Sequence, residues 1–121
     1  MGISILVVED EPDIMQLVLS LLIDHDYDGV GASDPEAALA LASHVRPSLF
    51  LIDIMLPRET GIELAEQLRS QGFADTPIIA MTASKLMSEL AVESGLFQAA
   101  IDKPFDIDVL IACIERYITG G

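Results

Sequence analysis

Short apolar runs that end in charged side chains constrain the fold of this chain more than any other feature. Residues 5–8 are wholly apolar and precede Glu9 and Asp10, and residues 49–52 are wholly apolar and precede Asp53. Four-residue runs of this kind are typical of strands that are buried on both faces of a parallel sheet. In an open α/β sheet the carboxyl ends of the strands meet at one crevice, where ligands bind. We therefore expect these carboxylates to share one acidic pocket.

Strand and helix signals alternate five times along the chain. The predicted strands cover about residues 4–8, 28–32, 48–52, 78–81 and 98–101, and the predicted helices cover about residues 12–23, 35–42, 60–68, 86–93 and 105–118. Residues 14–23 are mostly apolar, which predicts a first helix that is buried on more than one side. Five such units imply right-handed crossovers and a parallel sheet with helices on both faces.

The predicted fold class is therefore α/β, with a flavodoxin-like, doubly wound sheet of five parallel strands. The strand order expected for such a sheet is 2-1-3-4-5, which places the switch point between strands one and three. Asp10 and Asp53 would flank that switch point. A length of 121 residues predicts a single domain over residues 1–121 with a core of its own.

The charge composition argues against several classes of partner. The chain has 20 acidic and six basic residues, for a formal net charge of -14. Nucleic acids and anionic membranes are disfavoured as direct partners because phosphate contacts need clustered Lys and Arg. Cys113 is the only cysteine, so an internal disulfide is excluded and a reducing compartment is expected. Neither a signal peptide nor an apolar run of bilayer length is recognisable, which predicts a soluble cytoplasmic protein.

The expected pocket has the composition of a cation and phosphoryl site. Glu9, Asp10 and Asp53 carry three negative charges, and Lys103, which follows the fifth predicted strand, returns one positive charge. Carboxylates without His or Cys favour Mg²⁺, Mn²⁺ or Ca²⁺ over Zn²⁺. The ammonium of Lys103 and the hydroxyl of Thr82 add hydrogen-bond donors for phosphate oxygens. The set indicates phosphoryl transfer, which depends on positioning and charge neutralisation.

Four stretches of the sequence carry a family resemblance. They are residues 5–12 (ILVVEDEP), residues 51–57 (LIDIMLP) with Gly61, residues 81–83 (MTA) and residues 103–105 (KPF). In this order and at this spacing, they make the chain resemble the receiver domain of two-component response regulators along nearly its whole length.

The resemblance implies a role for each side chain of the pocket. Asp53 would be the phosphoacceptor, taking a phosphoryl group from a phosphohistidine. Asp10, Asp53 and the backbone carbonyl of Met55 would hold Mg²⁺, or Mn²⁺ in its place, and Glu9 would act mainly through water. Lys103 would pair with Asp53 or with its phosphate.

The resemblance also implies a switch. Thr82 would move to bond the new phosphate, and the bond between Lys103 and Pro104 would be cis. Receivers usually carry an aromatic residue three positions before the lysine, but this chain has Ala100 there, so the aromatic half of the switch is missing. The implied partners are a sensor histidine kinase or a histidine phosphotransfer protein, and an unknown downstream protein. A homodimer is possible under this interpretation.

Two alternative functions remain at this point. A Mg²⁺-dependent phosphohydrolase with an aspartyl-phosphate intermediate would use the same carboxylates. The related haloacid-dehalogenase pattern needs a second Asp two residues after the nucleophile, where this chain has Met55. A flavodoxin-like cofactor binder would need donors for a phosphate after the first strand, but Glu9, Asp10 and Glu11 would repel it.

Overall fold

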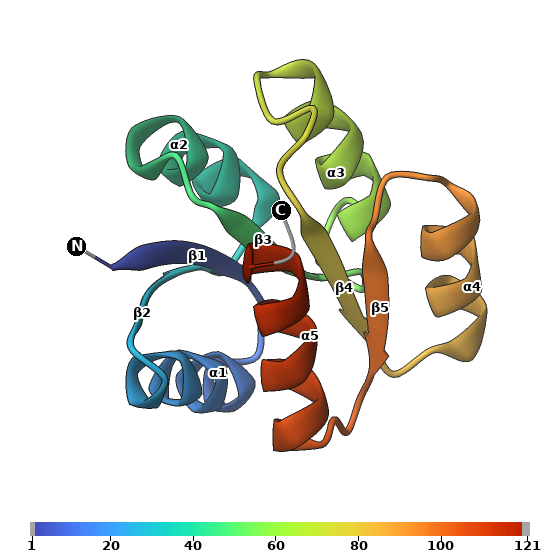
Figure 1. Cartoon of the computed structure of the whole chain (residues 1–121). Coiled ribbons are helices and arrows are strands. Elements are labelled where there is room, and N and C mark those ends of the chain that lie inside the picture. The colour runs from blue at the N-terminus through green and yellow to red at the C-terminus, as the bar shows by residue number, and fades with distance from the viewer. Residues whose placement is uncertain (1, 120–121) are drawn as a thin grey trace.

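Five strands and five helices alternate in the computed structural model, which describes residues 2–119 (Figure 1). The strands are β1 (Ile3–Val8), β2 (Tyr27–Ala32), β3 (Leu49–Asp53), β4 (Ile78–Thr82) and β5 (Ala99–Asp102). The helices are α1 (Pro12–Asp24), α2 (Pro35–Val45), α3 (Gly61–Ser70), α4 (Lys85–Glu93) and α5 (Ile107–Thr119). Residues 1, 120 and 121 of the expected domain lie outside the described range.

All four strand pairings are parallel, and the sheet has the order β2-β1-β3-β4-β5. The predicted fold class and strand order are confirmed. Because every strand runs in the same direction, the carboxyl ends of all five lie along one edge of the sheet. Residues that follow the strands are therefore brought together whatever their separation in the sequence.

The sheet separates two hydrophobic cores. Alternate strand residues such as Leu6, Phe50 and Ile78 face a core that is covered by α2, α3 and α4. The intervening residues, such as Val7 and Leu51, face a second core that is covered by α1 and α5 (Figure 1). β3 and β4 are buried along their whole length because helices cover both of their faces. This burial explains why these strands appear in the sequence as unbroken apolar runs.

Side-chain caps place the beginnings of three helices. Asp34 accepts a hydrogen bond from the Ala37 N–H (2.8 Å) at the start of α2, and Ser84 accepts one from the Met87 N–H (3.2 Å) at the start of α4. Thr60 and Glu63 form a capping box at the start of α3. Such caps satisfy N–H groups that have no partner within the helix. The loops that leave β3 and β4 therefore end at defined points close to the edge of the sheet.

The expectation that α1 is buried on more than one side was wrong. Only Val18 and Leu22 of this helix are fully buried, whereas Leu17 is 46% exposed and Ile23 is 66% exposed. α1 packs on the outer side of one sheet face, with α5 as its neighbour on that face (Figure 1). A helix in such a position buries one stripe, and side chains on its opposite side remain in solvent even when they are apolar.

The remaining differences from the predicted boundaries are small. α2 extends to Val45, three residues beyond the predicted end, and α5 begins at Ile107 instead of residue 105 or 106. The later start of α5 has a local cause, because the Asp106 carboxylate accepts a hydrogen bond from the Asp108 N–H (2.8 Å). The Asp106 carbonyl also accepts one from the Leu110 N–H (3.0 Å), so Asp106 precedes the first helical residue.

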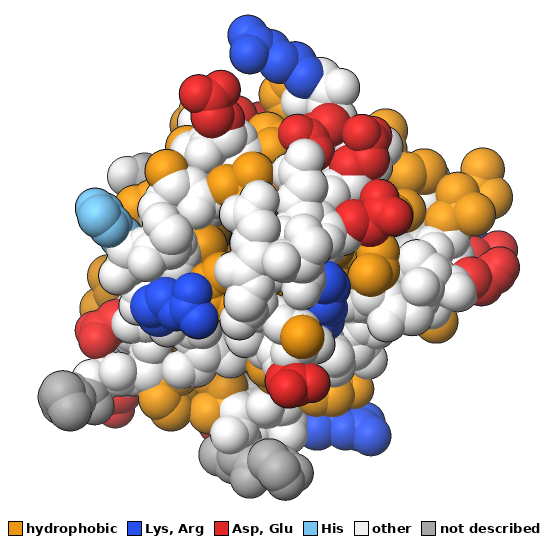
Figure 2. Space-filling view, turned by 90° about the horizontal axis from the view of Figure 1, so that it is seen from above, with side chains coloured by type: hydrophobic (Ala, Val, Ile, Leu, Met, Phe, Trp, Pro, Cys, Tyr) orange, Lys and Arg blue, Asp and Glu red, His pale blue; other side chains and the backbone are white. Residues whose placement is uncertain are grey.

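The distribution of basic side chains on the surface is relevant to the prediction that nucleic acids and membranes are not direct partners. On the face that Figure 2 shows, Lys and Arg side chains are separated from one another by neutral and acidic groups. Among residues 2–119, no helix is both long enough and apolar enough to cross a bilayer. The lack of such partners stays a prediction.

Candidate functional site

Three carboxylates from two strands converge at the carboxyl edge of the sheet. Glu9 and Asp10 follow β1, and Asp53 is the last residue of β3, which pairs with β1. One carboxylate oxygen of each residue lies within 4.8 Å of the corresponding oxygens of the other two. Glu9 and Asp53 are buried, at 1% and 5% exposed, whereas Asp10 is open to solvent. The cluster therefore consists of two buried carboxylates and one carboxylate that is exposed to solvent.

Lys103 is the basic member of this cluster. It follows β5, and its N–H donates to the Thr82 carbonyl (2.9 Å), which continues the pairing of β5 with β4. Its ammonium donates to Glu9 Oε1 (2.5 Å) and to Asp53 Oδ2 (3.1 Å). Both residues were expected in one pocket, but Lys103 was expected to pair with Asp53, so the direct contact of Lys103 with Glu9, 94 positions away, was not predicted. The bond between Lys103 and Pro104 is cis, as the resemblance implies.

The loop after β3 is folded tightly against Asp53. The Met55 N–H donates to Asp53 Oδ1 (3.0 Å), so both oxygens of this carboxylate accept a hydrogen bond. The Gly61 N–H donates to the Ile54 carbonyl (2.8 Å), which brings the start of α3 onto the end of β3. A Cβ atom at Gly61 would lie 2.6 Å from the Asp53 carbonyl oxygen, so a larger residue would displace this backbone. The Met55 backbone is thereby held beside the carboxylate.

Thr82 ends β4, the strand next to β3, and is fully buried. Its hydroxyl oxygen accepts a hydrogen bond from the Ser84 N–H (3.1 Å), while Ser84 in turn caps α4. This contact leaves the hydroxyl proton of Thr82 available for another acceptor. Because Ser84 is hydrogen-bonded to Thr82 and caps α4, a movement of the Thr82 side chain would also move the backbone at the start of α4.

Burial and pairing act in opposite directions on the two buried charged partners. Burial raises the pKa of Glu9 above its ordinary value, and the hydrogen bonds from Lys103 and from the Glu11 N–H offset only part of this effect. Burial alone would lower the pKa of Lys103, but its hydrogen bond to Glu9 and the nearby Asp53 outweigh burial and raise it. Three carboxylates against one ammonium leave an excess of negative charge. The cluster thus suits a divalent cation with oxygen ligands.

The raised pKa of Glu9 predicts a pH dependence of stability in magnesium-free buffer. The folded chain binds the Glu9 proton more tightly than the unfolded chain, so the free energy of unfolding should rise as pH falls from neutral to about pH 5. The raised pKa of Lys103 adds stability that is complete in this range and is lost only at alkaline pH.

Chemical denaturation at several pH values would measure this dependence. Because other carboxylates also respond to acid, the comparison is with Glu9→Gln, which should show a smaller rise. An equal rise in both proteins would contradict the assignment to Glu9.

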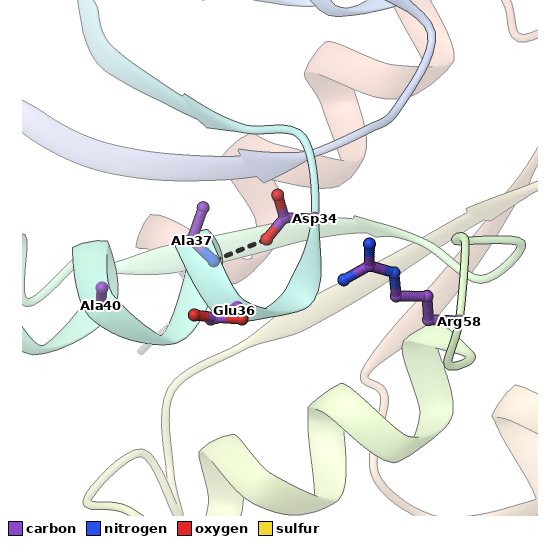
Figure 3. A pocket seen from close by; sticks show the side chains of 5 residues that line it. All are labelled: Asp34, Glu36, Ala37, Ala40 and Arg58. Carbon is purple, nitrogen blue, oxygen red and sulfur yellow. Dashed lines mark hydrogen bonds between the residues drawn. The ribbon is translucent and has the colours of Figure 1, made fainter.

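A separate hollow of about 350 Å³ lies between the start of α2 and the loop after β3. Its lining consists of Asp34, Glu36, Ala37, Ala40 and Arg58, and the Arg58 guanidinium points toward Asp34 (Figure 3). None of these residues belongs to the carboxylate cluster. The chemistry described above is therefore not located in this hollow.

Known proteins resemble the chain in both sequence and structure. Residues 5–115 match the response regulator receiver domain family. The response regulator MprA of Mycobacterium sp. (strain KMS) is 36% identical over 115 residues, which are 93% of this chain and 49% of that protein. The alkaline phosphatase synthesis transcriptional regulatory protein PhoP of Bacillus subtilis is 43% identical over 83 residues, which are 69% of this chain and 34% of that protein. The chain thus spans about half the length, or less, of these curated relatives.

Solved structures agree with this match. The chemotaxis protein CheY4 of Vibrio cholerae has a TM-score of 0.90 at 27% identity, over 97% of this chain and 99% of that chain. NtrX of Brucella abortus, solved in complex with ADP, has a TM-score of 0.90 at 31% identity, over 99% of this chain and 28% of that chain.

Proposed function

Because the chain belongs to the response regulator receiver domain family, we propose that it accepts a phosphoryl group on Asp53 and thereby switches a partner-binding surface. The observation that carries the proposal is the environment of the Asp53 carboxylate. It is buried, it lies in the acidic cluster, and it accepts a hydrogen bond from the Lys103 ammonium at 3.1 Å. A carboxylate in this setting can act as a nucleophile toward phosphorus, because a cation offsets the repulsion between two anions.

The proposed reaction moves one phosphoryl group. An Asp53 carboxylate oxygen forms a bond to phosphorus, and the bond from phosphorus to the histidine nitrogen of the donor breaks, with its electron pair remaining on that nitrogen. Lys103 would donate to the phosphoryl oxygens, and the Met55 N–H would hold Asp53 in position; the hydrogen bonds of both groups to the Asp53 carboxylate support these roles. The product is an acyl phosphate, which water can later hydrolyse to restore the carboxylate. This self-dephosphorylation is part of the proposal.

The residues present fit a Mg²⁺ ion, with Mn²⁺ as a substitute. Asp10, Asp53 and the Met55 backbone carbonyl would hold it, and Glu9 would act mainly through water. The fit is supported by three clustered carboxylates, by the exposure of Asp10 and by the single counter-charge. The ion would supply positive charge that offsets the negative charge of the incoming phosphoryl group.

Thr82 is the proposed link between phosphorylation and the surface. The new phosphate adds negative charge and acceptor oxygens at the edge of the sheet. The Thr82 hydroxyl would turn to donate to one of these oxygens, and this movement would carry the backbone of Ser84 and the start of α4. A local electrostatic change would thus favour one of two positions of this segment. β5, which pairs with the strand that ends in Thr82, has Ala100 at the position where receivers usually carry an aromatic side chain.

The proposed partners follow from the same chemistry. A sensor histidine kinase or a histidine phosphotransfer protein would donate the phosphoryl group, and an unknown downstream protein would read the switched surface. A homodimer, a cytoplasmic location and a single domain over residues 1–121 stay predictions.

Phosphorylation with a small donor tests the proposed function. The purified chain, incubated with acetyl phosphate and Mg²⁺, should gain the mass of one phosphoryl group and shift on a phosphate-affinity gel. Peptide mapping should place the group on Asp53. Chelation of Mg²⁺ should prevent the gain. Rapid hydrolysis of a phosphate ester such as p-nitrophenyl phosphate, without a stable phosphoprotein, would instead support the phosphohydrolase.

Mg²⁺ should stabilise the folded chain. A ligand that binds only the folded state at about 100 times its dissociation constant adds about 2.7 kcal/mol to the free energy of unfolding. Thermal unfolding at rising Mg²⁺ concentration should show this effect in the wild type, and Asp10→Asn should lose most of it. Asp24→Asn is the control, because Asp24 is an exposed acid at the end of α1. An equal response of all three proteins would contradict a site at Asp10.

A further inference from the structure

β5 leads directly into Lys103, the basic residue of the site, but the side chains of β5 fix its position on β4 only weakly. It is an edge strand of four residues, and Ala99 and Ala100 within it are only half-buried. A shift of a strand by two residues keeps every side chain on its original face, so a weak hydrophobic pattern leaves the register poorly determined. Lys103 follows this strand directly. A shift of β5 along β4 would therefore move the ammonium away from Glu9 and Asp53.

Gln98, the residue directly before β5, makes contacts that fix one register of this strand on β4. Its backbone N–H donates to the Ile78 carbonyl (2.9 Å), and its side-chain Oε1 accepts from the Ile78 N–H (2.7 Å). Both backbone groups of Ile78 are thus satisfied by the same residue. The Tyr117 hydroxyl of α5 also donates to the Gln98 carbonyl (3.0 Å). Each of these bonds would break if β5 moved along β4.

Arg69, in the last turn of α3, also contacts Gln98 and the loop that precedes β5. One of its terminal nitrogens donates to the Leu96 carbonyl (2.6 Å) and to Gln98 Oε1 (3.1 Å). The other donates to the carbonyls of Phe73 (2.7 Å) and Thr76 (2.6 Å) in the loop before β4. The loops that enter β4 and β5 lie at the same end of the sheet (Figure 1). The acidic cluster lies at the opposite end, where the strands end. One guanidinium therefore joins the beginnings of both strands.

We propose that Gln98, held by Arg69, is a positioning residue that sets the register of β5 on β4 and so places the Lys103 ammonium on Glu9 and Asp53. The inference deepens the proposed function and rests on it for its kinetic consequence. The pairing between β4 and β5 begins with the Gln98 N–H on the Ile78 carbonyl and ends with the Lys103 N–H on the Thr82 carbonyl. A residue at one end of the strand thus determines the geometry at the other end.

The test compares two substitutions of similar size. Gln98→Leu removes the acceptor and leaves the Ile78 N–H without its partner, whereas Gln98→Glu keeps an acceptor for Ile78 and for Arg69. Val18→Ala is the control for general loss of stability, because Val18 is a buried residue of α1, the helix that packs on β1 and β2. If Gln98→Leu does not fold, Gln98→Asn is the second variant, since its amide is one methylene too short to reach Ile78.

The first measurement observes Lys103 directly and needs no phosphorylation. The chain has only two lysines, so NMR of the side-chain ammonium groups gives a signal for Lys103 and one for the exposed Lys85 as an internal reference. In Gln98→Leu the Lys103 signal should move toward that of Lys85. In Gln98→Glu and Val18→Ala it should stay at the wild-type position.

The second measurement is the rate of phosphorylation by acetyl phosphate with Mg²⁺. Gln98→Leu should be slower by about tenfold, as expected for a displaced catalytic group, while Gln98→Glu stays within about twofold of the wild type. A wild-type signal and rate in Gln98→Leu would overturn the inference, and so would equal changes in Val18→Ala. If the wild type is not phosphorylated at all, the proposed function fails, and the Lys103 signal alone decides the role of Gln98.

Discussion

Asp53→Asn should abolish phosphorylation by acetyl phosphate while the chain remains folded. The substitution removes the nucleophilic oxygen, and loss of a nucleophile costs on the order of 10⁴-fold or more in rate. The asparagine carbonyl can still accept from the Met55 N–H, and Lys103 keeps its contact with Glu9. Removal of one of three clustered carboxylates also relieves repulsion. In magnesium-free buffer the variant should therefore be at least as stable as the wild type.

Asp102→Asn is the matched control for this experiment. Asp102 directly precedes Lys103 but is exposed and does not belong to the carboxylate cluster. It should be phosphorylated like the wild type, as judged by intact mass and by a phosphate-affinity gel. Phosphate on another residue of Asp53→Asn, in an amount similar to the wild type, would contradict the assignment of Asp53. Loss of phosphorylation in Asp102→Asn would show that the effect is not specific to the cluster.

The sequence was sufficient to predict the architecture because the strands are buried on both faces. Residues 49–52 and 78–81 are apolar without interruption, and a parallel sheet between two helix layers buries both of their faces. The burial of α1 could not be predicted in the same way. Its composition shows many apolar residues, but it does not show how many neighbours the helix will have. Leu17 and Ile23 are exposed for that reason.

The site was predictable only as far as strand topology determines it. Glu9 and Asp10 follow β1 and Asp53 ends β3, so the parallel sheet places them at one edge, although their chemical roles stay predictions. Contacts that depend on side-chain length and on loop geometry left no pattern in the sequence. The ion pair of Glu9 with Lys103 is one such contact, and the double hydrogen bond of Gln98 with Ile78 is another.

Arg69→Met should cause the largest loss of stability among the substitutions considered. The Arg69 guanidinium donates to four backbone carbonyls, those of Phe73, Ala74, Thr76 and Leu96, and to the Gln98 side chain. Methionine fills similar space but leaves these acceptors without their donor. Three of these bonds, to Phe73, Thr76 and Leu96, are part-buried, and a hydrogen bond to a charged group contributes about 1.5–3 kcal/mol, so the free energy of unfolding should fall by about 3 kcal/mol or more. A domain of this size has roughly 6–18 kcal/mol in total, so the variant should still fold.

Two further substitutions identify the cause of that loss. Arg69→Lys keeps the charge, but a single ammonium nitrogen cannot serve carbonyls on both the loop before β4 and the loop before β5, so its loss should be intermediate. Arg116→Met removes an exposed arginine on α5 whose guanidinium lies 5.5 Å from the Tyr117 ring centre, and it should cost about 1 kcal/mol or less. Urea denaturation of all three variants measures these differences. If Arg69→Met loses no more stability than Arg116→Met, the hydrogen bonds of Arg69 do not hold the two strands together. The register of β5 would then have to depend on the contacts of Gln98 with Ile78 and Tyr117 and on the pairing with β4.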